Sequence, residues 1–529
     1  MPGRPGAMLA DRTVNAGRTS RLGRLATAFA VALLALPGYA MGGEAGLDPT
    51  FGSGGRVVSS FPGSSAYAGM IASMPDGGLV AAGSACKLPR LTIPQCGLAL
   101  VRYGPAGNEL KRTPSDFAGG ENLVPGGVAV DSQGRIVVGG RYFPSEESPA
   151  LIGYLPDGSV DPRFSSATVF SDRFPLAMVG AVAIDAQDRI VVAGRGAAIA
   201  SLFIGRLLPS GAFDPSFGGG DGVAEIPGYS GHGITDLVIA PGGGIFLSTI
   251  GTGGENTLVS SLSALGPDGT LRTDFDVSRK FRVDAYIRAV ALDSRARILA
   301  LVGPHHGRPF VVRLSADGRL DRSFGKAGLA GLRKGEGSVP SGIAVDSLDR
   351  ALVVAGRFRV IRFTPSGQRD HRFAPDGVAK ASFGKGFWAY SLDMLLDSAG
   401  RIVVAGQRDP GKLDPLDRNP MDLEGQFALA RFGYPACRTS SATVIGTPGD
   451  DHLIGTAGRD VVLAGGGNDR VSAGDGNDLI CAGAGEDVVF AGAGRDGVYG
   501  GGGMDRLYGQ AGFDRLFDRR TDLLRLGPQ

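Results

Sequence analysis

A nine-residue repeat near the C-terminus constrains the fold of this chain more than any other feature. From Gly446 to Phe517 the sequence reads as eight uninterrupted copies: GTPGDDHLI, GTAGRDVVL, AGGGNDRVS, AGDGNDLIC, AGAGEDVVF, AGAGRDGVY, GGGGMDRLY and GQAGFDRLF. The fourth residue is always glycine, the sixth always aspartate and the eighth always aliphatic. A short fixed period indicates that successive copies stack as the coils of a solenoid.

Each constant position has a physical role. Glycine permits positive φ in a tight turn, and the aliphatic residue points inward from a short strand. We expect two copies to form one coil of a parallel β-roll, which aligns the aspartates in two columns. One column holds Asp451, Asp469, Asp487 and Asp505, and the other holds Asp460, Asp478, Asp496 and Asp514.

Aligned carboxylates favour a divalent cation. Two carboxylates about 4.8 Å apart on adjacent coils repel by about 3 kcal/mol at an effective dielectric of about 20. A hard dication between the coils turns this repulsion into a net attraction. Calcium accepts many oxygen ligands more readily than magnesium does. Because each site needs a coil on both flanks, we expect at most six. The predicted ligands are the eight aspartates and the carbonyl groups of Gly449, Gly458, Gly467, Gly476, Gly485 and Gly494.

These nonapeptides resemble the hemolysin-type repeats of RTX proteins, which implies Ca2+ binding. The chain departs from the pattern locally: alanine replaces the first glycine in four copies, and Met504 and Phe513 precede the last two aspartates. Those departures count against the outermost site. A glycine-rich solenoid without metal would leave the aligned aspartates unexplained. Since the segment has few large apolar residues, we expect it to fold only when it binds calcium, after export.

The N-terminus has the pattern of a signal peptide over residues 1–40. Arg18, Arg21 and Arg24 precede the apolar run Leu25 to Leu36, and Gly38 and Ala40 suit cleavage after Ala40. The alternative is a transmembrane anchor, but about twelve apolar residues are too few to span about 30 Å of hydrocarbon. The sequence therefore predicts a secreted or cell-surface-associated protein with no membrane span in the mature chain.

The four cysteines agree with export because an even set permits disulfide bonds. Cys86 and Cys96 are close in sequence, which favours a local loop clamp. That leaves Cys437 with Cys481. Neither pair has the spacing of a zinc or redox motif.

A second, longer repeat occupies residues 47–434. A unit of 51 to 57 residues recurs seven times, each with four short alternating strands. Its clearest marker is an aspartate, a turn and an apolar run, as in Asp131 to Val138, Asp185 to Val192 and Asp397 to Val404. Seven four-stranded units predict an all-β fold, a seven-bladed β-propeller followed by the parallel β-roll over 437–517 and a tail over 518–529.

A second marker, Asp-Pro-x-Phe-Gly, supports the closed ring. The aspartate is expected to organise a turn, and the phenylalanine to fill the gap between neighbouring sheets. The marker occurs at Leu47 to Gly52, ahead of the first unit, but is missing after Phe427 to Phe432, the third strand of the seventh unit. We therefore expect an N-terminal strand to complete the last blade, which removes exposed sheet edges.

These units resemble the delta-60 repeat family over Leu47 to about Tyr434, on the Asp-x-x-Gly-Arg-Ile-Val-Val and Asp-Pro-Ser-Phe-Gly elements. The resemblance implies an extracellular repeat protein and no particular activity, because propellers host both enzymes and binding modules.

No catalytic constellation is evident in the sequence. His232, His305, His306, His371 and His452 are the only histidines, and none has a second zinc ligand at a suitable spacing. The sole tryptophan, Trp388, is expected in the core or at a blade interface. The best candidate binding loops are 86–96, 141–149 and 407–426.

The sequence predicts a secreted, non-enzymatic calcium-binding protein whose propeller is an interaction or surface module. The alternative is a secreted propeller hydrolase or lyase acting on an extracellular polysaccharide. Convergent carboxylates in the propeller channel would favour the alternative, and an apolar or filled channel would favour the binder. The expected partners are calcium and an extracellular ligand or surface; a formal net charge of +2 gives no indication of nucleic-acid binding.

Overall fold

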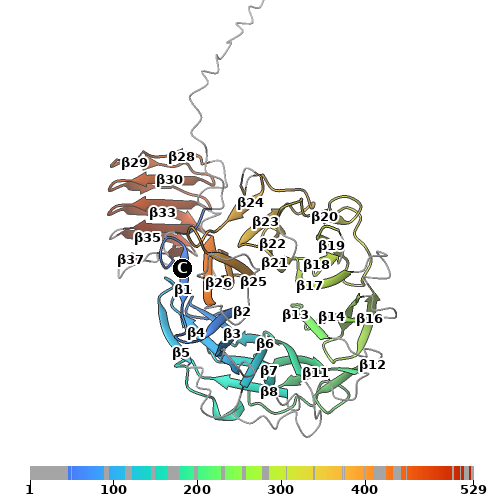
Figure 1. Cartoon of the computed structure of the whole chain (residues 1–529). Helices are drawn as coiled ribbons and strands as arrows, with labels where there is room; N and C mark the ends of the chain where they lie inside the picture. The colour runs from blue at the N-terminus through green and yellow to red at the C-terminus, as the bar shows by residue number, and fades with distance from the viewer. Residues whose placement is uncertain are drawn as a thin grey trace, which may run out of the picture. The chain divides into compact units, whose positions relative to one another are not determined.

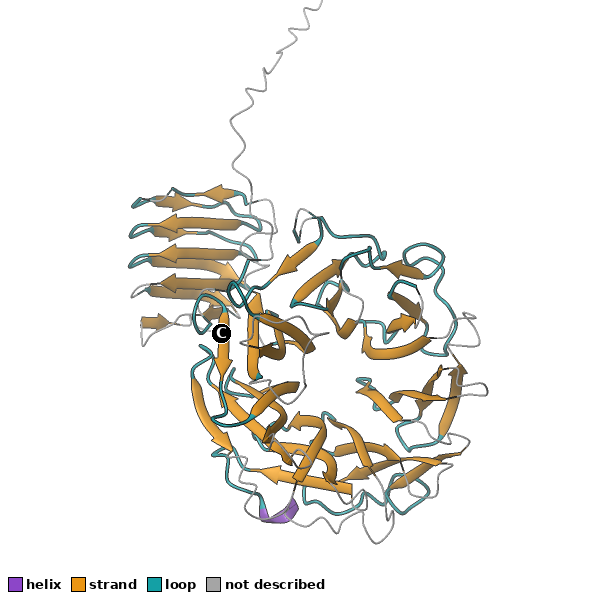
Figure 2. Cartoon of the chain, viewed as in Figure 1, coloured by secondary structure: helices purple, strands orange, loops and turns teal. Residues whose placement is uncertain are grey.

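The computed structural model consists almost entirely of β-strands, in agreement with the predicted fold class (Figures 1 and 2). The structure describes residues 46–48, 51–87, 95–113, 122–143, 149–164, 178–195, 201–227, 233–252, 258–276, 285–304, 307–336, 340–371, 373–374, 376–397, 400–409, 425–432, 442–447, 449–502, 505–512, 514–517 and 523–525.

Seven sheets of the described residues form the blades of a propeller (Figure 1). Blade one contains β2 (Ser65–Ser73), β3 (Leu79–Lys87), β4 (Gln95–Tyr103) and β5 (Glu109–Thr113); blade two contains β6 (Asn122–Val130), β7 (Ile136–Phe143) and β8 (Pro149–Tyr154), followed by the 3-10 turn η2 (Pro162–Phe164). Blade three contains β9 (Met178–Ile184), β10 (Ile190–Arg195), β11 (Ser201–Leu207) and β12 (Val223–Pro227); blade four contains β13 (Gly233–Ile239), β14 (Ile245–Thr252), β15 (Leu258–Leu265) and β16 (Leu271–Asp276).

The remaining three blades follow the same antiparallel order. Blade five contains β17 (Ala285–Leu292), β18 (Ile298–Pro304), β19 (Phe310–Leu314) and β20 (Leu329–Gly331); blade six contains β21 (Pro340–Val345), β22 (Ala351–Ala355), β23 (Arg359–Phe363) and β24 (Val378–Lys380). Blade seven contains β25 (Trp388–Leu396), β26 (Ile402–Asp409), β27 (Gln426–Phe432) and the N-terminal strand β1 (Arg56–Ser59). Blade two has three strands rather than the expected four; its fourth would fall on residues 165–177, outside the described part.

The N-terminal strand closes the ring, as predicted. Strand β1 pairs antiparallel with β27, with Arg56 opposite Ala430 and Ser59 opposite Phe427. Ahead of β1, Leu47 forms an isolated bridge with Phe432. Strands from the two ends of the repeat region therefore share one sheet.

The phenylalanine of the Asp-Pro marker fills the gap between neighbouring blades, also as predicted. Phe51, Phe164, Phe217, Phe324 and Phe373 are each at most 1% exposed. Four of these rings, those of Phe51, Phe164, Phe217 and Phe324, have a glycine where a turn of the next blade approaches them. A Cβ on Gly107, for example, would lie 2.8 Å from the ring of Phe51. Glycine at that turn therefore leaves room for the ring.

An arginine on the third strand connects the marker to the next blade. In blade five, Arg313 Nε donates to Asp321 Oδ2 at 2.9 Å, and its Nη1 donates to the carbonyl oxygen of Pro365 in blade six at 2.6 Å. The guanidinium carbon lies 4.6 Å from the centroid of the Phe324 ring. The marker aspartate is thus a structural residue, as the sequence indicated, but its arginine partner was not predicted.

The nonapeptides form two parallel sheets, which confirms the β-roll. One sheet contains β28 (Val444–Ile445), β30 (Val461–Gly466), β32 (Leu479–Ala484), β34 (Gly497–Gly502) and β36 (Arg515–Phe517), and the other contains β29 (His452–Ile454), β31 (Arg470–Ser472), β33 (Val488–Gly494), β35 (Arg506–Gly512) and β37 (Leu523–Arg525). The aliphatic residues at the eighth position pack into one core with the alanines at the first position. Strand β37 lies beyond the last nonapeptide and pairs with β35.

The Cys86–Cys96 disulfide is present, as predicted. Cys481 is also disulfide-bonded, whereas Cys437, its expected partner, lies outside the described residues. The predicted signal peptide, most of the three candidate binding loops, and His232, His305 and His306 also lie outside them. No helix in the described part of the chain is long and apolar enough to cross a membrane.

Candidate metal centre and propeller channel

The structure aligns the repeat aspartates in the two predicted columns. In six places the backbone N–H of one aspartate donates to Oδ1 of the aspartate 18 residues later, at 2.8–3.1 Å. The donor and acceptor pairs are Asp451 and Asp469, Asp469 and Asp487, Asp487 and Asp505, Asp460 and Asp478, Asp478 and Asp496, and Asp496 and Asp514. The parallel register of the strands therefore holds one carboxylate above the next.

The second oxygen of each acceptor carboxylate is buried without a hydrogen-bond donor. This applies to Oδ2 of Asp469, Asp478, Asp487, Asp496, Asp505 and Asp514. A buried carboxylate oxygen without a donor is costly, because burial removes its hydration. The six oxygens equal in number the six pairs of stacked aspartates, three in each column, so each pair contains one oxygen that can bind a cation.

The first aspartate of each column differs from the rest. Thr447 donates to Asp451 Oδ2 from its N–H at 2.5 Å and its hydroxyl at 2.9 Å. Thr456 does the same for Asp460 at 2.6 and 2.9 Å. Both threonines occupy the second position of their repeats, where the next five copies have glycine. The change from threonine to glycine at this position indicates which two carboxylates already have hydrogen-bond donors. The predicted ligand set, which treats all eight aspartates alike, did not take this into account.

The electrostatics of the columns follow from this crowding. Burial, with repulsion from neighbouring aspartates, raises the pKa of Asp487 and of Asp496 to about 6. The pKa values of Asp469 and Asp478 are also raised, mainly by burial. In contrast, a hydrogen bond from the Thr443 hydroxyl lowers the pKa of Asp460. The interior of the columns therefore resists negative charge unless a cation compensates for it.

The glycines at the fourth position bring the backbones of neighbouring coils into close contact. A Cβ on Gly494 would lie 1.6 Å from the carbonyl oxygen of Gly476, one coil earlier, and a Cβ on Gly512 would lie 1.6 Å from that of Gly494. The φ angles of Gly494 and Gly512 are +150° and +133°. The fourth position therefore requires glycine for space as well as for backbone conformation.

A matched pair of substitutions tests this requirement. Gly494→Ala should destabilise the β-roll by more than about 3 kcal/mol, because the new methyl group overlaps a backbone carbonyl that cannot move without breaking the coil. Gly497→Ala is the control, since a Cβ there meets only Leu479 Cδ1 at 3.5 Å. Circular dichroism melts in calcium would measure both. Equal stability of the two variants would contradict the close approach.

Side chains alone do not complete a metal site. Among the described residues, no group of three or more His, Cys, Asp or Glu side chains could hold an ion. An ion at the columns would therefore need carbonyl oxygens besides carboxylates, in keeping with the predicted ligand set.

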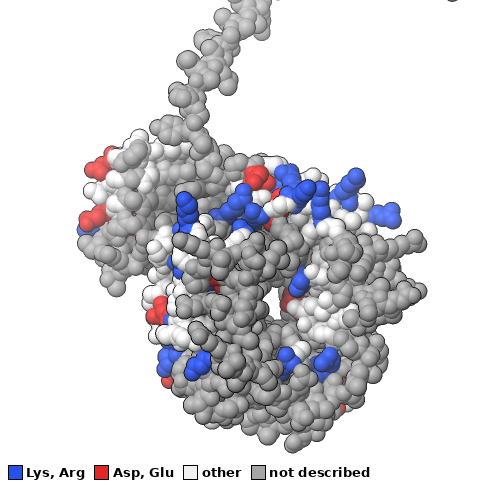
Figure 3. All heavy atoms as spheres, in the orientation of Figure 1, with Lys and Arg blue, Asp and Glu red and all other residues white. Residues whose placement is uncertain are grey.

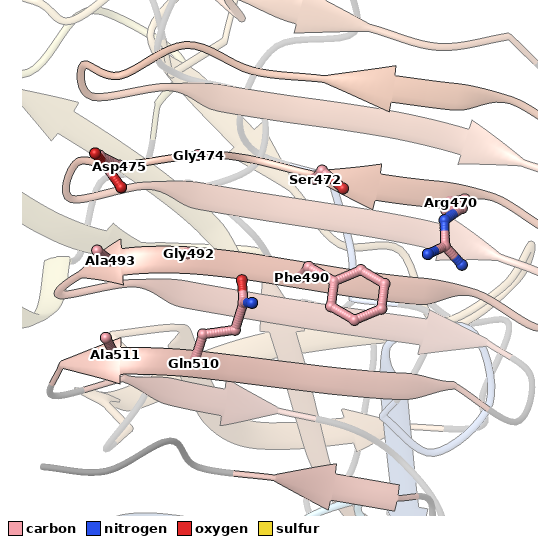
Figure 4. A pocket seen from close by; sticks show the side chains of 9 residues that line it. All are labelled: Arg470, Ser472, Gly474, Asp475, Phe490, Gly492, Ala493, Gln510 and Ala511. Atoms are coloured by element: carbon pink, nitrogen blue, oxygen red, sulfur yellow. The ribbon is translucent and has the colours of Figure 1, made fainter.

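The outer face of the second roll sheet contains a shallow cavity of about 490 Å3 (Figure 4). The rings of Phe490 and Tyr508 stack with centroids 4.9 Å apart, and the guanidinium of Arg470 lies 4.9 Å from the Phe490 centroid. Gln510 has a φ of +69° at a position where the five preceding copies have glycine. The stacked side chains, 18 residues apart, add contacts between coils on this face.

The propeller channel contains a second cavity, of about 370 Å3. The first strands of all seven blades line it, and each of these strands has a break in register opposite its partner. The residues at the breaks, all lining the cavity, are Gly69, Gly126, Gly180, Thr235, Arg288, Ser341 and Leu392. Charged atoms of both signs reach the hollow at the centre of the ring (Figure 3).

Two carboxylates line this channel, one from blade four and one from blade seven. Asp236 accepts the N–H groups of Leu237 and of Val290 in the next blade, both at 2.8 Å. Asp393 accepts those of Met394 at 2.7 Å and of Ile71 in blade one at 3.0 Å. Burial raises the pKa of Asp236 to about 6 and that of Asp393 to about 7. Neither residue was among the sites predicted from the sequence.

Trp388 lies at a blade interface, as expected, and is half-buried. The guanidinium of Arg357, which follows β22 of blade six, lies 3.7 Å from its ring centroid. The two described histidines, His371 and His452, are exposed.

Comparison with known proteins identifies the nonapeptides. Residues 445–480 and 482–517 match the model of the RTX calcium-binding nonapeptide repeat. No curated protein sequence matches the chain. Three similar solved structures are YCF48 bound to a D1 peptide (10% identity, 72% of this chain and 97% of that one, TM-score 0.40), the calcium-binding protein regucalcin from Agrobacterium tumefaciens (16%, 59% and 92%, TM-score 0.33) and a protein of unknown function from Bacteroides caccae (11%, 44% and 70%, TM-score 0.27).

Proposed function

We propose that the RTX repeats of this chain bind six calcium ions, one at each pair of stacked aspartates. The observation that carries this proposal is the row of six buried Oδ2 atoms without a donor. In each pair, the later aspartate would contribute that oxygen, and the glycine carbonyls would contribute further ligands. Bound calcium would neutralise the columns and fix the coils against one another.

The residues present suit calcium better than other common metals. All available donors are hard oxygens, and the pattern offers neither the thiolates nor the imidazoles that zinc prefers. Magnesium requires a nearly ideal octahedron and retains its waters, which a cleft of carboxylates and carbonyl groups does not favour. The outermost pair, Asp496 with Asp514, has the same orphaned oxygen as the inner pairs, which supports a site there despite the sequence departures.

Calcium binding and folding of the β-roll are proposed to be coupled. The coils are the binding site, so the site does not exist in the unfolded chain, and the binding free energy stabilises the folded state alone. In a compartment with scarce calcium the segment would stay unfolded. We therefore propose that the chain is exported, as the pattern of residues 1–40 suggests, and that the β-roll forms outside the cell.

A substitution within the columns tests the stoichiometry. Asp487 belongs to two pairs, so Asp487→Asn should lower the number of bound ions from six to four or five, measured by equilibrium dialysis with calcium determined by atomic emission. Asp475→Asn is the control, because Asp475 is exposed on the outer face of the roll and lies outside both columns. Loss of the same number of ions in both variants, or six ions in both, would refute the assignment.

The propeller is proposed to be a non-enzymatic interaction module built from delta-60 repeats. The Asp-to-Arg pair of the first marker recurs in the described blades: Asp131 with Arg135, Asp185 with Arg189, Asp293 with Arg297, Asp346 with Arg350 and Asp397 with Arg401. Each is internal to a blade, which supports a structural role for the residues that carry the resemblance.

The rival function, a hydrolase or lyase acting on an extracellular polysaccharide, receives support from one observation. The channel contains two carboxylates with raised pKa values, a feature common at catalytic sites. However, each carboxylate already accepts two backbone N–H groups, one from its own strand and one from the next blade. A reducing-end assay on extracellular polysaccharides would distinguish the two functions. Release of new reducing ends by the native chain, and not by Asp393→Asn, would favour the enzyme.

A further inference from the structure

Two carboxylates line the cavity of the propeller channel, those of Asp236 and Asp393. Among the residues that the structure describes, no cationic side chain forms an ion pair with either of them or lowers the pKa of either. Burial is the main cause of the raised pKa of Asp393, and the charge of Asp236 adds to it. Both aspartates are half-buried, and a carboxylate partly removed from water usually has an ion-pair partner, is protonated or binds a ligand.

The other charged side chain of the cavity does not supply that partner. Arg288 lines the channel from blade five, but its Nη2 donates to the Tyr286 hydroxyl at 2.9 Å. Its guanidinium carbon lies 4.2 Å from the Tyr286 ring centroid. Arg288 is thus held against its own strand and, among the described residues, forms no ion pair with either aspartate.

The two aspartates depart from the pattern of their own repeat. Each immediately follows the residue at the register break of its strand, Thr235 in blade four and Leu392 in blade seven. The equivalent residues of the other blades are Met70, Gly127, Ala181, Ala289 and Gly342. Five of seven blades therefore close and pack without a carboxylate at this position, so blade geometry alone does not require one.

The remaining lining favours an organic cation over a metal ion. Each aspartate oxygen already accepts one backbone N–H, and no third acidic or histidine side chain joins them among the residues the structure describes. A hard dication would need six or more oxygens at short range. An ammonium group needs only two or three acceptors, and the carboxylates and the hydroxyls of Thr235 and Ser341 all line this cavity. Met70, Val128, Leu237 and Leu392 also line the cavity and offer contacts to an apolar body.

We propose that the propeller channel is a binding site for a small organic amine, with its ammonium group held by Asp236 and Asp393 and its apolar part against the aliphatic lining. This proposal is independent of the calcium sites of the β-roll. A cavity of about 370 Å3 accommodates an amine of about ten non-hydrogen atoms.

The test uses the full mature chain in calcium and a matched set of probes. By isothermal titration calorimetry at pH 7.5, 2-phenylethylamine should bind, and at least about tenfold more tightly than its neutral isostere 2-phenylethanol, because charge-assisted hydrogen bonds are the stronger ones. Phenylacetate, of similar size and opposite charge, should not bind. Absence of amine binding, or equal binding of amine and alcohol, would overturn the proposal, as would preferential binding of phenylacetate, which would point to Arg288.

Variants locate the binding in the channel. Asp393→Asn should lower the affinity for 2-phenylethylamine at least about tenfold, because the substitution removes the negative charge and keeps one acceptor oxygen. The control Asp268→Asn changes an exposed turn aspartate of blade four and should leave affinity unchanged. Should Asp393→Asn fail to fold, Ser341→Phe keeps both carboxylates and fills the cavity, and it should abolish binding. Native affinity in Ser341→Phe would refute the channel as the site.

A pH titration provides a second readout. The charged or titratable side chains that line the cavity are Asp236, Asp393, Arg288 and Tyr67. Protonation of the two aspartates between pH 7.5 and 5.0 should lower the affinity for 2-phenylethylamine at least about tenfold. The ammonium group of the ligand stays charged over this range. Unchanged affinity at pH 5.0 would contradict carboxylate recognition.

Discussion

Chelation of calcium at pH 7.5 will leave the nonapeptide strands unprotected against amide hydrogen exchange while the propeller strands stay protected. In calcium, the amides of β32 to β35 should exchange at least about 1000-fold more slowly than in chelator, a difference of about 4 kcal/mol. Each ion held at about 100 times its Kd contributes about 2.7 kcal/mol to the folded state, so six sites suffice. Mass spectrometry of peptides from the full chain measures both domains in one sample.

The internal control is β26 in blade seven, whose exchange should not respond to chelation. Magnesium in place of calcium should not restore protection, because its preferred geometry needs ordered waters in the cleft. Strands β32 to β35 that remain protected in excess chelator would show that the β-roll folds without metal, and would remove the main argument for calcium-dependent folding.

Acid should partly replace calcium in the same experiment. The folded-state pKa values of Asp487 and Asp496 are raised to about 6 from an ordinary value near 4. A raised carboxyl pKa means that the folded state holds its proton more tightly than the unfolded state does. The contribution to stability is therefore present below about pH 4 and is lost as the pH rises through 6. In chelator, protection of the roll should be greater at pH 4.5 than at pH 7.5.

The sequence predicted the two repeats and their strand order, and missed several of the contacts that individual side chains make within and between them. The period of nine residues determined the register of the roll, because any other pairing would expose the aliphatic eighth position. It also predicted the two aspartate columns and the upper limit of six sites. The displaced Asp-Pro marker at Leu47 to Gly52 predicted closure by β1 for a similar reason, since one copy of the pattern was missing at the other end.

The channel carboxylates show where such reasoning stops. Asp236 and Asp393 stand in ordinary alternating strands, and nothing local distinguishes them from turn or surface aspartates. Their role depends on the register break beside them and on an N–H group of the next blade, Val290 in one case and Ile71 in the other. Those contacts join residues 54 and 322 positions apart, which a pattern of short motifs does not connect.

Arg431→Ala will destabilise the propeller more than any equivalent substitution in an inner blade. Arg431 is 1% exposed; its Nε donates to Asp48 Oδ2 at 2.8 Å, its Nη1 donates to the Pro105 carbonyl oxygen in blade one at 2.6 Å, and its guanidinium carbon lies 4.4 Å from the Phe51 centroid. Removing one partner of a buried ion pair costs about 3–5 kcal/mol, since the other charge stays buried. Chemical unfolding followed by fluorescence of Trp388, which lies in blade seven, would measure the loss.

Arg313→Ala is the matched control, because Arg313 makes the same three contacts in blade five. The two differ in chain connectivity: Asp321 follows Arg313 by eight residues, whereas Asp48 and Arg431 are 383 residues apart. Without Arg313 the chain itself keeps the marker near its blade. Without the Arg431 side chain the N-terminal segment keeps the pairing of β1, the Leu47 bridge to Phe432 and the ring of Phe51, but its return after detachment carries the entropy of closing a very long loop. Hydrogen exchange of β1 should therefore accelerate in Arg431→Ala and not in Arg313→Ala, and equal exchange in both variants would mean that the ring is closed by strand pairing without help from this arginine.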